Sequence, residues 1–164
     1  MKTIILAGFL FISISLNAQT RKVYLSSEKI DGLRCEYYKE INGIDTSYYI
    51  IMTFKNAKYS SLSDMHALLF TKSADDQLEL SFFKTDLISA IHEIDDKKSE
   101  ISWSKKNYRI DKFNFSKNIY ITATNQLIEG YFIFDKGDVA HLLNWLSRIN
   151  FGSDILSPEI KVKY

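Results

Sequence analysis

The sequence predicts an α+β domain in which an antiparallel sheet of about seven strands carries two helices on one face. Alternating apolar and polar runs of strand length recur along the chain, and short turns such as Asn42-Gly43 separate them. Two longer stretches repeat apolar residues at spacings of three and four, which indicates amphipathic helices. Each helical stretch follows a strand and a short acidic turn. This order indicates a pseudo-repeat of strands followed by a helix.

A secretory signal peptide is expected at residues 1–18. Lys2 precedes an uncharged apolar run from Ile4 to Leu16, and a short polar exit follows. The run has thirteen residues, whereas a transmembrane helix needs about 20. We therefore expect cleavage before Gln19, export to the periplasm or the extracellular space, and a single domain at residues 19–164 without a stable membrane anchor.

Four strands are expected before the first helix, at residues 22–28, 33–41, 48–54 and 66–71. Asn42-Gly43 between alternating runs is typical of a hairpin. The run at 48–54 is apolar on both faces, which places it in the middle of a covered sheet.

The first helix is expected to begin at Ser73, because Asp76 three places later completes a capping-box-like start. Its apolar stripe is Leu80, Phe83, Leu87, Ile91 and Ile94. The alternative takes Leu78 to Phe82 as a strand ahead of a shorter helix. The long helix, ending near Asp96, is the preferred interpretation.

The second half repeats this order. Ile101 and Trp103 share one strand face, and a change of alternation between Ile110 and Phe113 predicts a bulge near Asp111. A hairpin around Asn125-Gln126 joins two further runs, residues 119–123 and 131–134. The second helix starts at Asp135 and ends by Gly152; its stripe is Val139, Leu142, Leu143, Leu146 and Ile149, with Trp145 at the edge. The tail at 153–164 is either an edge strand or frayed.

Charge and cysteine content exclude several classes of protein. The leader carries Lys2 and no acid, so residues 19–164 hold 20 basic and 20 acidic side chains, which does not favour nucleic-acid binding. Cys35 is the only cysteine, so no disulfide forms within the chain and no lipid anchor is expected at the mature amino terminus. Its alternation with Leu33 and Tyr37 predicts a buried structural thiol, with a nucleophile or an intermolecular bridge as the alternative.

No catalytic residue, metal site or cofactor is predicted. His66, His92 and His141 lie far apart, and the chain has neither a Gly-x-Ser-x-Gly elbow nor a glycine-rich phosphate loop. The acidic doublets Asp75-Asp76 and Asp95-Asp96 fall at the two ends of the first helix, where the first pair complements the helix dipole.

Aromatic content is the remaining signal. Tyr38, Tyr59, Tyr108 and Tyr120 are candidate ligand-binding residues, because a tyrosine joins a flat apolar ring to a polar tip. Together they would form a face for a sugar or a protein; the alternative is that they are core or scattered surface residues.

The leader ending Asn17-Ala18-Gln19, the stretch Asn56–Asp64 and the segment Phe115–Tyr120 resemble small exported proteins of Bacteroidetes-type bacteria that have no established function. The resemblance implies a location in the bacterial envelope or outside the cell and carries no active site. The sequence as a whole favours an exported non-enzymatic binding domain whose partner is an envelope protein or a glycan. The alternatives are a small secreted hydrolase with an acid-pair or histidine site, and a carrier of a small apolar ligand.

Overall fold

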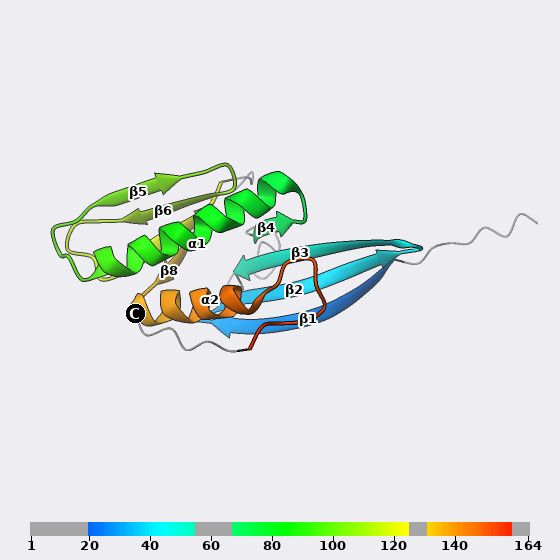
Figure 1. Cartoon of the computed structure of the whole chain (residues 1–164). Helices are drawn as coiled ribbons and strands as arrows, with labels where there is room; N and C mark the ends of the chain where they lie inside the picture. The colour runs from blue at the N-terminus through cyan, green and yellow to red at the C-terminus, as the bar shows by residue number, and fades with distance from the viewer. Residues whose placement is uncertain (1–19, 55–66, 125–130, 159–164) are drawn as a thin grey trace, which may run out of the picture.

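The computed structural model describes residues 20–54, 67–124 and 131–158 (Figure 1). In chain order the elements are β1 (Arg21–Ile30), β2 (Leu33–Asn42), β3 (Asp45–Phe54), β4 (Ala67–Thr71), α1 (Ala74–Ile94), β5 (Ile101–Ser104), β6 (Tyr108–Lys112), β7 (Ile119–Ala123), β8 (Tyr131–Phe134) and α2 (Lys136–Arg148). The α+β class and the two helices are therefore confirmed. Among the described residues, neither helix has the length and apolar character needed to span a membrane.

The strands form two separate sheets, so the prediction of one sheet of about seven strands is wrong. One sheet has the order β1-β2-β3-β4 and the other β5-β6-β7-β8, and every pairing is antiparallel. Within each half, sequential strands pair with one another. The 21-residue helix α1 separates the halves, and the chain beyond it starts a new sheet instead of extending the first.

Two tight turns set the register of the first sheet. Asp31 and Gly32 both have positive φ, 38° and 84°, as a type I′ hairpin turn requires. Gly43 has φ 63° at the first central position of the next turn, which is the type II′ arrangement. The Asn42-Gly43 signal therefore marks a real hairpin, with Asn42 opposite Asp45.

The first helix α1 spans both sheets. Its start is the predicted one, since the Ser73 hydroxyl accepts a hydrogen bond from the Asp76 amide at 3.1 Å. On the buried stripe, the ring centroid of Phe83 lies 5.9 Å from that of Phe70 on β4 and 4.8 Å from that of Tyr108 on β6. One aromatic side chain thus ties a strand from each sheet to the same helix.

The second helix α2 lies over the first sheet, although it follows the second sheet in chain order. A capping box between Asp135 and Asp138 starts the helix, and its predicted stripe is buried. Trp145, predicted at the stripe's edge, is only 2% exposed, and its indole N–H donates to the Ser26 hydroxyl on β1 at 3.0 Å. Both helices lie on the same side of the sheets in Figure 1, and their apolar faces share one core with them.

The predicted bulge near Asp111 is absent. The chain forms two strands there, β5 and β6, which pair without a register shift. The alternation changes because β6 ends at Lys112 and a turn follows. A bulge does occur between β1 and β2, at Tyr24 to Ser26.

Lys112 is a buried cation that closes the end of α1. Its side chain is fully buried, and Nζ donates to the Asp96 carbonyl at 2.7 Å and to the Ser99 carbonyl and hydroxyl at 2.7 and 2.8 Å. Three acceptors match the three N–H bonds of an ammonium group, and a cation at a helix C-terminus is favourable. Lys112 therefore fixes the turn that leads from α1 into the second sheet.

Candidate functional site

The face of the second sheet turned away from the helices carries a set of exposed apolar side chains. We call Phe113, Tyr120, Tyr131 and Ile133 the outer apolar cluster. Phe113, Tyr131 and Ile133 are 52%, 59% and 43% exposed. Strand alternation places them opposite Tyr108 and Phe132, which are buried under the helices.

The rings of the outer apolar cluster contact one another at steep angles. The ring centroids of Phe113 and Tyr120 lie 5.1 Å apart at 61°, and those of Tyr120 and Tyr131 lie 5.8 Å apart at 60°. Beside them on the same face, Arg109 Nε lies 2.8 Å from the Asp111 carboxylate, which also accepts from the Ser102 hydroxyl at 2.6 Å. The face thus presents a ridged apolar surface next to charged and hydroxyl groups.

The turn after Phe113 holds a further aromatic side chain outward. Phe115 is 77% exposed and has φ 64°, a left-handed conformation that costs a non-glycine residue about 1–3 kcal/mol. Its amide donates to the Lys97 carbonyl at 2.8 Å, and the Ser116 amide donates to the Phe113 carbonyl at 3.0 Å. The turn is therefore well hydrogen-bonded, yet the Phe115 ring gains little packing within the molecule.

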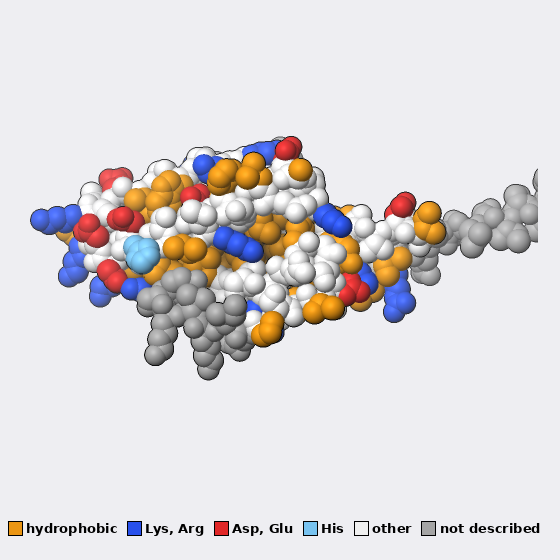
Figure 2. All heavy atoms as spheres, viewed as in Figure 1, with side chains coloured by type: hydrophobic (Ala, Val, Ile, Leu, Met, Phe, Trp, Pro, Cys, Tyr) orange, Lys and Arg blue, Asp and Glu red, His pale blue; other side chains and the backbone are white. Residues whose placement is uncertain are grey.

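The helix side of the molecule also exposes apolar groups, as Figure 2 shows. On α1, Leu78, Phe82 and Ile88 are 56%, 44% and 41% exposed. The Phe82 ring has Lys105 Nζ at 5.1 Å from its centroid. The exposed ring on α1 thus has a positive charge beside it, whereas the exposed rings of the outer apolar cluster contact one another.

Of the four tyrosines predicted as ligand-binding residues, the three that the structure describes do not come together. Tyr38 is 7% exposed and stacks on Tyr49 at 5.1 Å, with Lys22 Nζ 3.7 Å from its ring centroid. Tyr108 is fully buried, and its hydroxyl donates to Asp86 on α1 at 2.7 Å. Tyr120 lies in the outer apolar cluster, while Tyr59 falls outside the described residues. Burial raises the pKa of Tyr38 to about 12.

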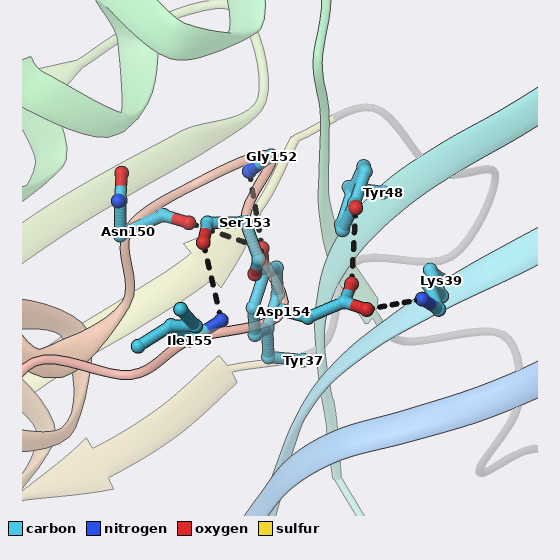
Figure 3. A network of polar contacts seen from close by, with 8 residues as sticks. All are labelled: Tyr37, Lys39, Tyr48, Asn150, Gly152, Ser153, Asp154 and Ile155. Carbon is cyan, nitrogen blue, oxygen red and sulfur yellow. Dashed lines mark hydrogen bonds and ion pairs between the residues drawn. The ribbon is translucent and has the colours of Figure 1, made fainter.

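A second candidate site lies where the chain returns over the first sheet after α2. We call residues 150–154 the C-terminal strap, which Figure 3 shows against β2 and β3. The Tyr37 hydroxyl donates to the Ser153 carbonyl at 2.7 Å and accepts from the Gly152 amide at 3.0 Å. Asp154 pairs with Lys39 and accepts from the Tyr48 hydroxyl at 3.0 Å. The bonds from Lys39 and Tyr48 lower the pKa of the Asp154 carboxyl.

Replacing Tyr37 with Phe should release the strap locally. The change leaves the Ser153 carbonyl and the Gly152 amide without their partner, so we expect a loss of about 1–2 kcal/mol in the free energy of unfolding. Hydrogen exchange at the Gly152 amide should become faster. The matched change Tyr48→Phe removes only an exposed hydroxyl contact and should leave that amide protected. Unchanged exchange at Gly152 in Tyr37→Phe would show that the hydroxyl does not hold the strap.

A pocket of about 230 Å³ opens beside the strap, at the edge of the first sheet. Its lining comes from β3 and from the turn between β4 and α1: Thr46, Ser47, Tyr48, Tyr49, Thr71, Lys72 and Ser73. Six of the seven lining residues carry a hydroxyl group and Lys72 carries an ammonium group, although apolar atoms form somewhat more than half of the lining surface. The pocket can therefore contact both polar and apolar parts of a ligand.

Of the acids and histidines considered for a hydrolytic or metal site, Asp76 and Asp95 have structural partners, and His66 lies outside the described residues. Asp76 accepts from the Thr71 amide at 3.0 Å, and Asp95 pairs with Lys136 of α2 at 2.5 Å. His141 lies 3.3 Å from Glu28, and His92 is an exposed residue of α1. No group of three metal-ligating side chains occurs within residues 20–54, 67–124 and 131–158.

No family model, no curated protein and no solved structure matches this chain.

Cys35 lies on the core face of β2, in phase with Leu33 and Tyr37, and is fully buried. Burial, and next the charge of Glu28, raise the pKa of its thiol. We expect a thiol reagent to label Cys35 slowly in native buffer and rapidly in denaturant. Rapid labelling of the native protein would instead support a reactive thiol.

Proposed function

We propose that this protein is an exported, non-enzymatic interaction domain that binds a protein partner through the outer apolar cluster. The observation that carries the proposal is the exposure of Phe113, Tyr131 and Ile133 around Tyr120, on the sheet face turned away from both helices. Aromatic residues and arginine are enriched at the centres of protein interfaces, and Arg109 lies on the same face. The exposed Phe115 in the adjoining turn adds support, because its left-handed backbone holds outward a ring that gains little packing within the free molecule.

The geometry favours a protein over a glycan. The rings meet at about 60°, so they form ridges and recesses instead of a flat platform for a sugar ring. Phe113 and Ile133 also have no polar side-chain atom with which to hydrogen-bond sugar hydroxyls. Apolar side chains of a partner can pack between tilted rings.

The test is affinity capture from an envelope extract of the native host with matched variants. Capture by the unaltered protein should fall at least about tenfold for the double variant Phe113→Ser, Tyr131→Ser, since central aromatic residues carry most of an interface's binding energy. Leu78→Ser, on the exposed face of α1, is the control and should retain capture. Equal capture by the double variant would contradict the proposal. Capture of material that resists protease would assign the face to a glycan instead.

A further inference from the structure

The backbone of β3 is open for hydrogen bonding at one end. Because Asn42 and Asp45 flank a two-residue hairpin turn, they form a hydrogen-bonded pair. The antiparallel pattern then alternates, so the amide and carbonyl groups of Thr46 and Tyr48 point away from β2. They point toward the side on which β4 lies.

The strand β4 does not reach these residues. Its pairing with β3 ends at Tyr49 opposite Thr71, and the chain then turns into α1. Figure 1 shows β3 continuing well past the end of β4 toward the hairpin tip. The pairing of Tyr49 with Thr71 places the Tyr48 carbonyl against the Lys72 amide, so in the described part of the chain the open groups at this edge are the amide and carbonyl of Thr46 and the amide of Tyr48.

The pocket lies against this edge and has one charged lining residue. Lys72 packs its side chain on Gly152 of the strap, where an added Cβ would lie 2.9 Å from Lys72 Cε. Its ammonium group is 5.8 Å from the Tyr48 ring centroid and has no ion pair among the described residues. A positive charge is thus available at the end of the open edge.

The nearby carboxylates are already bound. Asp76 accepts from the Thr71 amide and hydroxyl, and these bonds lower its pKa. Asp154 is held by Lys39 and Tyr48 on the strap side. Within the described residues neither carboxylate pairs with Lys72, so its exposed ammonium group is available to an acidic ligand.

We infer that β3 binds an extended peptide segment that adds to the sheet in line with β4 and places an acidic side chain against Lys72. The backbone groups of Thr46 and Tyr48 supply the hydrogen bonds of the added strand. The hydroxyl groups of the pocket surround the carboxylate. This site shares no residue with the outer apolar cluster, so it can fail or hold independently of the proposed function.

The test is a selection of displayed random heptapeptides on the immobilised protein. Enriched peptides should carry an acidic residue among β-favouring neighbours, and their affinity should fall at least about tenfold for Thr46→Pro, which removes an edge amide. Thr46→Ala keeps that amide and should bind as before. Lys72→Gln should weaken binding by a similar factor, whereas Lys29→Gln, an exposed change on β1, should not.

A proline on an edge strand is tolerated where its nitrogen faces away from the paired strand, so Thr46→Pro should fold. A second measurement avoids any dependence on that variant. In the unaltered protein, a selected peptide should slow hydrogen exchange at the Thr46 and Tyr48 amides. Failure to enrich any peptide, or enriched peptides that leave both amides unprotected, would overturn the inference.

Discussion

Replacing Leu146 with Ala is expected to lower the free energy of unfolding by about 2–5 kcal/mol, the range for truncating a large aliphatic side chain in a packed core. Leu146 is fully buried on α2, one turn from Leu142, which is also fully buried. The helix covers the first sheet, so the cavity would open in the shared core of both halves. Urea unfolding followed by circular dichroism measures the change.

The control for this prediction must lie on the same helix and outside the core. The helical pattern places Asn144 opposite the apolar stripe, but its side chain is half-buried in the structure. Asn144→Ala would therefore also remove packing contacts and is unsuitable as a control. Ser147 is exposed, and Ser147→Ala should change the stability by no more than about 0.5 kcal/mol. Similar results for Leu146→Ala and Ser147→Ala would mean that α2 is not docked on the sheet.

Local patterns predicted the elements well because each one is specified by its own residues. Gly43 is needed at a positive φ, so the Asn42-Gly43 signal located the second hairpin turn. The spacing of Leu80, Phe83 and Leu87 fits a helix and not a strand, and α1 does run from Ala74 to Ile94. The run at 48–54 is apolar on both faces, and β3 is an inner strand.

The division into two sheets could not be predicted in the same way. Alternation shows that a strand has a buried face, but it does not say which strand lies beside it across a long helix. Phe83 would contact Phe70 and Tyr108 whether or not β4 and β5 paired with each other. Its place on the helical stripe therefore does not indicate whether the strands form one sheet or two. Trp145 was misplaced for a related reason: its burial depends on β1, a strand more than a hundred residues away.

The candidate surface was predicted only in part. Tyr120 was among the four tyrosines singled out, but its neighbours Phe113 and Tyr131 were not, since cross-strand pairing brings them together. The parity change between Ile110 and Phe113 was the available signal. It was interpreted as a bulge, whereas it marks the end of β6 and the outward turn of Phe113.

Replacing Lys112 with Met is expected to lower the free energy of unfolding by about 2–5 kcal/mol, although Met has a similar length and is apolar. Exchanging a complete buried ion pair for apolar residues is often neutral, because both charged partners are removed together. Here two of the three acceptors are the carbonyls of Asp96 and Ser99, which no side-chain substitution can remove. They would remain near a methionine that cannot donate to them.

The same experiment separates this cause from a general effect of losing a positive charge. Lys117 is exposed in the turn after β6, and Lys117→Met should leave the stability within about 0.5 kcal/mol of the unaltered protein. If Lys112→Met unfolds at the same denaturant concentration as Lys117→Met, the desolvation of the ammonium must cancel its three hydrogen bonds. A loss of stability in Lys112→Met alone would instead establish that this buried cation holds the end of α1 against the second sheet. The Phe115 amide donates to the Lys97 carbonyl just after that end, so Lys112 would then also fix the turn from which Phe115 projects.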